Sequence, residues 1–102
     1  MQPQQPQQPG QQRNLQIKIP DEILKGAYAN AMSVIHSKEE FILDFLNLYP
    51  HQGNGIVMAR VVLSPGHLKR VVAALQDNIQ KYEKQFGKLA AAEAPQGDVG
   101  FH

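Results

Sequence analysis

Cysteine is absent from the 102-residue chain. Disulfide bonds and thiolate metal sites are therefore excluded, and packing alone must hold the fold together. An excess of one charge is also missing, because 10 Lys and Arg stand against 9 Asp and Glu, for a net charge of +1. Bulk charge thus does not indicate a strongly basic nucleic-acid binder, although a local basic patch is compatible with it.

Long hydrophobic runs are missing too. No stretch approaches the ~20 apolar residues of a membrane-spanning helix. The N-terminus does not show a basic segment followed by an apolar one, the pattern of a secretory signal. We therefore expect a cytoplasmic protein that does not bind to or cross a membrane.

Motifs for catalysis and metal binding are scarce. His36 and Glu40 are four residues apart, but no H-x-x-x-H spacing or comparable ligand set exists. No serine lies in a G-x-S-x-G elbow, and GNG at 53–55 fits a hairpin turn better than a phosphate loop. We predict a protein that is not an enzyme and has no metal or cofactor. A small enzyme or ligand carrier would require a pocket that gathers His36, Glu40 and Asp44.

Composition divides the chain into three parts. Residues 1–14 hold seven Gln and three Pro with no apolar side chain beyond Met1. Such a segment cannot bury enough surface to offset its ordering entropy, which predicts a disordered Gln/Pro-rich arm. Residues 15–88 form the single predicted domain, and residues 89–102 a flexible C-terminal tail.

Hydrophobic alternation predicts four strands. Residues 15–20 alternate apolar and polar side chains and end at a proline, as a half-buried strand does. Residues 27–37 and 41–50 are predicted as the next two strands, although a helical period fits both segments as well. The turn HQGNG at 51–55 then leads into 56–63, which is dense in Val and Ile.

One long helix follows the last strand. Ser64 is a favourable N-cap, Pro65 suits the first helical position, and Gly87 suits the residue after the helix. Apolar residues between them recur at spacings of four and three: Leu68, Val72, Leu75, Ile79, Tyr82 and Phe86. The sequence therefore predicts an α+β fold in ββββα order, with a four-stranded antiparallel sheet.

The strands carry more apolar residues than one helix can cover. We expect one sheet face to pack on the helix and the other to expose Met32, Val34, Ile42, Leu46, Met58 and Val62. Because exposed apolar patches usually mark interfaces, we predict a homodimer or higher homo-oligomer. The predicted oligomer interface consists of Leu68, Val72, Leu75, Ile79, Tyr82, Phe86, Met32, Ile42 and Met58. If the last two strands pair, Asp44 and Arg60 are expected to form a cross-strand ion pair.

Two segments resemble a known family. GAYANAMSVIHSKEEFILDF (26–45) and ARVVLSPGHLKRVVAALQDNIQKYEKQFG (59–87) are similar to the bacterial family called domain of unknown function 3467. The matching elements include Tyr28-Ala29-Asn30, His36-Ser37, Asp44-Phe45, Arg60, the LSP of 63–65, Lys69-Arg70 and Phe86-Gly87. The resemblance implies a small bacterial protein with variable tails, and it supplies no catalytic residues.

A looser similarity concerns topology. Four antiparallel strands followed by a dimerising helix resemble the single-strand-binding folds of positive cofactor 4, Whirly and Pur proteins. In those folds basic and aromatic residues of the sheet hold phosphates and stack bases. If this chain binds nucleic acid, we expect Lys18, Lys25, Arg60, Lys69 and Arg70 to contact phosphates, and Tyr28 or Tyr49 to stack on bases.

Two functions therefore compete. The first is an oligomeric protein-interaction or scaffold module that docks on a larger assembly, with polar residues such as Asn30 and Asp44 fixing the register of docking. The alternative is a single-stranded nucleic-acid or transcription-associated binding protein.

Overall fold

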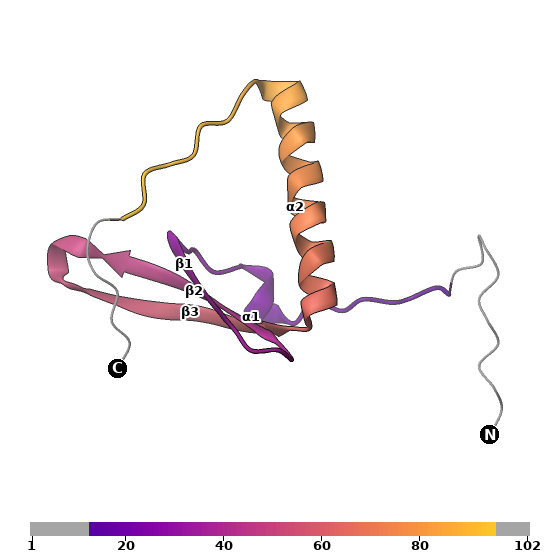
Figure 1. The fold of residues 1–102 in the computed structure, drawn as a ribbon, viewed down its shortest axis with the longest axis horizontal. Coiled ribbons are helices and arrows are strands. Elements are labelled where there is room, and N and C mark those ends of the chain that lie inside the picture. Colours follow the sequence, from indigo (N-terminus) through magenta and orange to yellow (C-terminus); the bar gives the residue numbers. More distant parts are fainter. Residues whose placement is uncertain (1–12, 96–102) are drawn as a thin grey trace.

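The computed structural model of the chain describes residues 13–95. Its elements are α1 (Asp21–Leu24), β1 (Ala31–His36), β2 (Phe41–Tyr49), η1 (Pro50–Gln52), β3 (Asn54–Leu63) and α2 (Pro65–Phe86). The three strands form one antiparallel sheet in the order β1-β2-β3, and α2 rises from one end of it (Figure 1). The predicted disordered arm up to residue 12 and the tail from residue 96 lie outside the described residues.

Two tight turns connect the strands. Between β1 and β2 the backbone N–H of Ser37 donates to the carbonyl of Glu40 at 2.9 Å. Between β2 and β3 the single turn η1 ends at Gly53, whose φ of 71° is readily adopted by glycine. Gly55 pairs with Leu48, and a Cβ at residue 55 would lie 2.6 Å from Leu48 Cδ2. Gly55 of the predicted turn therefore also permits close strand packing.

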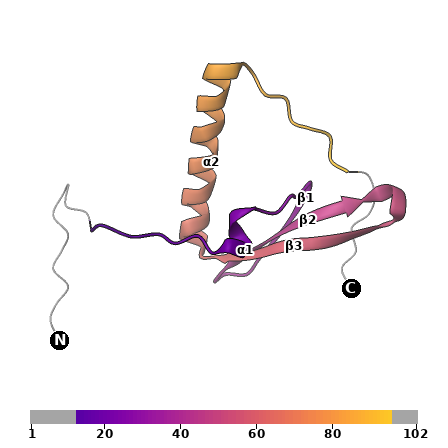
Figure 2. The ribbon, with the colours of Figure 1, turned by 180° about the vertical axis from the view of Figure 1, so that it is seen from behind.

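The prediction of a fourth strand at 15–20 is wrong, because the sheet has three strands. Leu15 and Ile17 are 78% and 86% exposed, and the segment runs away from the sheet (Figure 2). The helical turn α1 separates this segment from β1, and Gly26 with φ 76° redirects the chain after it. Alternation favours an extended backbone locally, but it does not supply a neighbouring strand to pair with.

The positions of the other three strands and of the long helix follow the predictions, whereas the short helix α1 was not predicted. Residues 31–36 and 41–49 are strands rather than helices, and β2 pairs along both edges. At the start of α2, the Ser64 hydroxyl accepts a hydrogen bond from the His67 backbone N–H at 3.2 Å. The helix ends before Gly87, whose φ is 99°.

Burial within the single chain is confined to the middle strand. Among the described residues only Leu43, Asp44 and Leu46 are buried, and all three belong to β2. The long helix has no buried residue, and only its ends include half-buried positions such as Leu68 and Val71. The body of α2 therefore does not complete a core with the sheet of its own chain, and the expectation that one sheet face packs on the helix is wrong.

The Ser64 cap makes the start of α2 testable. We expect Ser64→Ala to lower the free energy of unfolding by about 1 kcal/mol, because the His67 N–H loses its acceptor. Urea denaturation followed by circular dichroism at 222 nm, at one fixed protein concentration, measures the change. Ser64→Asp, which keeps an acceptor, is the matched control and should stay close to the wild type; equal losses in both variants would contradict the capping role.

Candidate functional site

A carboxylate and a guanidinium meet across the sheet, as predicted from the sequence. Asp44 on β2 pairs directly with Arg60 on β3. The Arg60 Nε donates to Asp44 Oδ1 at 2.7 Å, and Nη2 donates to Oδ2 at 2.8 Å. The side chain of Asp44 is 6% exposed, whereas that of Arg60 is 58% exposed. Arg60 thus covers the carboxylate while its own outer edge stays in solvent.

This contact sets the ionisation of both groups. The hydrogen bond from Arg60 lowers the pKa of Asp44 below its ordinary value of 3.8, against the opposing effect of burial. The same hydrogen bond raises the pKa of Arg60. The pair therefore stays charged at neutral pH, and two of the guanidinium N–H groups are already used within the chain.

Asn30, directly before β1, has a structural role that was not predicted from the sequence: its side chain binds the backbone of β2. Its side-chain Nδ2 donates to the Leu48 carbonyl at 3.1 Å, and its Oδ1 accepts from the Leu48 N–H at 2.8 Å. The amide thus makes the same pair of bonds to Leu48 that a backbone residue of β1 would make. Asn30 and Asp44, predicted to fix the register of docking, make these hydrogen bonds within the chain's own sheet.

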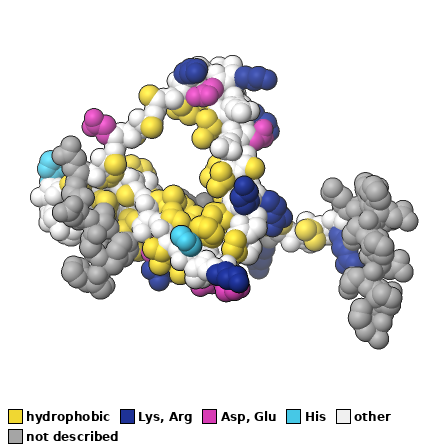
Figure 3. All heavy atoms as spheres, viewed as in Figure 1, with side chains coloured by type: hydrophobic (Ala, Val, Ile, Leu, Met, Phe, Trp, Pro, Cys, Tyr) yellow, Lys and Arg dark blue, Asp and Glu magenta, His cyan; other side chains and the backbone are white. Residues whose placement is uncertain are grey.

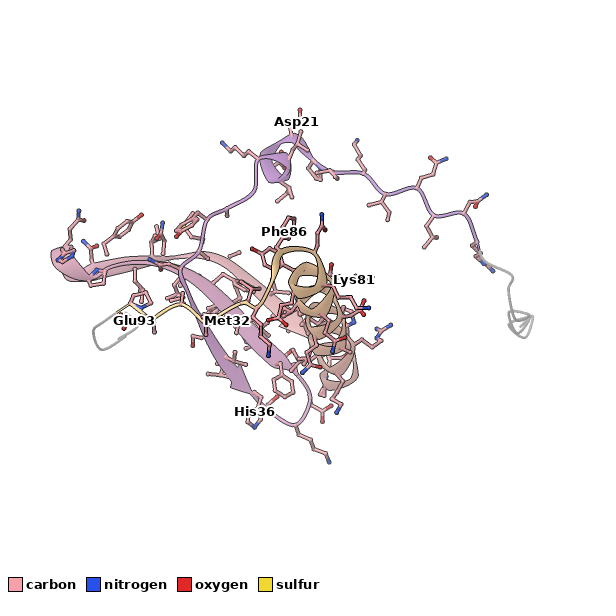
Figure 4. All side chains as sticks on the ribbon, turned by 90° about the horizontal axis from the view of Figure 1, so that it is seen from above. Asp21, Met32, His36, Lys81, Phe86 and Glu93 are labelled. Carbon is pink, nitrogen blue, oxygen red and sulfur yellow. The ribbon has the colours of Figure 1, made fainter. Side chains whose placement is uncertain are left out.

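An apolar stripe runs along α2. We use the name helix stripe for Leu68, Val72, Leu75, Ile79, Tyr82 and Phe86. All but Leu68 are at least 45% exposed, and the rings of Tyr82 and Phe86 contact each other with centroids 4.9 Å apart. Hydrophobic side chains line the side of α2 that faces the open angle above the sheet (Figure 3). Lys81, in contrast, lies on the side turned away from the sheet (Figure 4).

The apolar side chains of the sheet are divided between its faces. The register pairs Met32 with Phe45 and Ile42 with Val62, which places Met32 and Ile42 on opposite faces. The prediction that all six apolar strand residues share one face is therefore wrong. A bulge opposite Phe45 and Leu46 also interrupts the alternation at Met58. Both faces nevertheless expose large side chains, among them Met32, Val34, Ile35 and Val62.

The residues predicted to bind nucleic acid come from separate segments. Lys18 precedes α1, Lys25 follows it, and Tyr28 is exposed in the loop before β1. Lys69 and Arg70 are adjacent in the first turns of α2, where both are exposed. Tyr49 is the last residue of β2 and pairs with Asn54 at the start of β3, about 30 Å from the start of α2 at ~3.3 Å per strand residue. Lys69 and Arg70 are thus the two members of the set that are adjacent on one element.

Other functional groups of the described chain are dispersed. Within residues 13–95 no three His, Asp or Glu side chains are arranged to hold a metal ion. His36 stacks on Phe41 with ring centroids 5.3 Å apart. In the same part of the chain, neither helix combines the length and the hydropathy needed to span a bilayer.

Comparison with known proteins gives one match. A family model described as "Protein of unknown function (DUF3467)" matches residues 1–91. No curated protein and no solved structure matches the chain significantly. The resemblance expected from residues 26–45 and 59–87 is thereby confirmed.

Because Asp44 and Arg60 form an ion pair, we expect a single substitution to lower stability more than substitution of both residues. Arg60→Val should lower the urea midpoint strongly, because it leaves a buried carboxylate without its partner. The double variant Asp44→Val with Arg60→Val should recover much of the loss, since it removes both charges. Urea titrations at pH 7 and one protein concentration compare the two; a double variant less stable than Arg60→Val would contradict this account.

The same pair predicts a pH dependence. Because the pKa of Asp44 is lowered in the folded chain, its contribution to stability is present above 3.8 and is lost as the pH falls through the lowered pKa. The difference in midpoint between the wild type and Arg60→Val should therefore shrink between pH 5 and pH 2. An unchanged difference over this range would show that the carboxylate does not contribute through Arg60.

Proposed function

The chain belongs to the DUF3467 family, and we propose that this member is a homo-oligomeric protein-interaction module. The observation that carries the proposal is the position of the apolar side chains. Three residues of the described chain are buried, while the helix stripe and both sheet faces expose large apolar groups. Contiguous exposed apolar surface of this kind usually marks a protein interface.

The energy of covering the helix stripe supports association. Fully burying a Val, Leu, Ile or Phe side chain contributes roughly 1.5 to 3 kcal/mol. Five stripe residues are about half exposed or more, so covering them contributes roughly 5 kcal/mol per chain. That amount is comparable with the total stability of a small domain, about 5 to 15 kcal/mol. Association therefore supplies burial that one chain lacks.

The polar side of α2 supports a protein partner rather than a lipid surface. It carries both signs of charge, including an ion pair between Lys81 and Asp77 at 3.1 Å. Helices that lie on membranes usually present a polar side rich in Lys and Arg alone. The mixed side of α2 suits exposure to water around a protein interface.

A single-stranded nucleic-acid binder remains the second candidate, because Lys69 and Arg70 are exposed together where the sheet leads into α2. Arg60 supports it less, since its charge is paired with Asp44. Fluorescence anisotropy with a labelled single-stranded oligonucleotide distinguishes the two functions. Binding that weakens steeply with salt and is lost in Lys69→Gln with Arg70→Gln would favour the nucleic acid over the protein-interaction module.

The proposal predicts the mass of the protein in solution. Sedimentation velocity should give a multiple of 11.4 kDa for the wild type, and Ile79→Glu should shift it toward the monomer because a charge enters the apolar surface. Gln80→Glu is the matched control, with the same new side chain one residue away on the polar side. A monomeric wild type at 100 μM, or equal effects of the two variants, would contradict the proposal.

A further inference from the structure

We infer that α2 pairs with α2 of a second copy in antiparallel orientation, in one register set by the helix stripe. The inference rests on the proposed homo-oligomer and adds the orientation and the contacting residues. The stripe fits a heptad pattern with Val72, Ile79 and Phe86 at a and Leu68, Leu75 and Tyr82 at d. A second helix of the same length can cover such a stripe, which is largely exposed within its own chain.

Side-chain size favours the antiparallel register. In that register a and d positions form mixed layers: Leu68 meets the partner's Phe86, Val72 meets the partner's Tyr82, and Leu75 meets the partner's Ile79. Each large aromatic side chain therefore faces a smaller aliphatic one, which keeps the spacing of the two helices even. A parallel pair would place Phe86 and Tyr82 against their own copies at one end and Val72 against itself near the other.

Charge favours the same register. Lys69 and Glu83 both occupy e positions, and e positions of antiparallel helices lie beside one another. In the register set by the mixed layers, Lys69 lies level with the partner's Glu83, and symmetry repeats this pair at the other end. A parallel pair would bring e positions to g positions, where Val71, Asn78 and Gln85 carry no charge. Only the antiparallel pair thus gains two ion pairs.

The place of the sheet also decides between the orientations. Hydrophobic side chains line the side of α2 that faces the angle above the sheet (Figure 3), and only Ser64 separates α2 from β3. In a parallel pair both sheets would lie at the same end, each beneath the partner's helix, and would compete for the same space. An antiparallel pair places the sheets at opposite ends of a 22-residue helix, about 33 Å apart.

One feature of the stripe favours the opposite orientation. Val72 and Ile79 at a with Leu68 and Leu75 at d form the combination typical of parallel two-stranded coiled coils. Tyr82 and Phe86 do not continue that combination. In a parallel pair each of these aromatic side chains would face its own copy. The size, charge and sheet arguments therefore outweigh the aliphatic pattern.

Disulfide cross-linking tests the orientation, because the chain has no cysteine of its own. Residues 68 and 86 are about 27 Å apart along one helix, at ~1.5 Å per residue, so they cannot be linked within a chain. Oxidation of the double variant Leu68→Cys with Phe86→Cys should give a covalent dimer, with residue 68 linked to residue 86 in the tryptic peptides. Each single variant is the control and should stay uncrosslinked while sedimenting as an oligomer.

The other possible cross-linking results distinguish the antiparallel pairing of α2 from the proposed homo-oligomer. Covalent dimers of the single variants, linked 68 to 68 or 86 to 86, would show a parallel pair and overturn the inference while leaving the oligomer intact. An oligomer in which no variant is cross-linked would show that α2 packs elsewhere, for example on the partner's sheet. A wild type that sediments as a monomer would overturn both proposals.

Charge reversal tests the register independently. Lys69→Glu and Glu83→Lys should each weaken association roughly tenfold at low salt, because two attractive pairs become repulsive. The double reversal should return to within about threefold of the wild type, since the pairs are restored. Arg70→Glu makes the same charge change beside Lys69 but at an f position, so it should have little effect. Failure of the double reversal to recover affinity would overturn this register.

Discussion

A single layer of three strands has no second layer on which to bury its side chains, and this shortage of burial governs the rest of the structure. The middle strand β2 has neighbours on both edges, so the buried residues belong to it. The outer strands and α2 expose much of their apolar surface. Small domains already bury a low fraction of their surface, and this chain buries less because its helix stands away from the sheet.

Polar contacts specify the sheet where apolar packing is sparse. Asp44 and Arg60 join β2 to β3 through two charge-assisted hydrogen bonds. The amide of Asn30 joins the start of β1 to β2 through two more. Each contact forms only in one register, so a slip by one residue would separate the partners. The sheet can therefore keep a defined geometry although few of its apolar side chains are buried.

The sequence predicted the features that depend on near neighbours. As expected, α2 begins directly after Ser64 and ends directly before Gly87. The pairing of Asp44 with Arg60 followed from the prediction that their two strands are neighbours. The segment 15–20 was predicted wrongly because its alternation shows a preference for extended backbone and not whether another strand lies beside it. The prediction that Met32 and Ile42 lie on the same face was wrong, because the face of each residue depends on the register between strands. Asn30 was missed as a substitute strand residue, since its partner Leu48 is distant in sequence.

We propose that association with further copies stabilises the fold of this chain. The dependence of the thermal midpoint on protein concentration, followed by circular dichroism from about 1 to 100 μM, tests this stabilisation. Because association stabilises the folded state by mass action, we expect a midpoint that rises steadily over this range. A reversible transition with the same midpoint at every concentration, from a protein that sediments as a monomer, would contradict it.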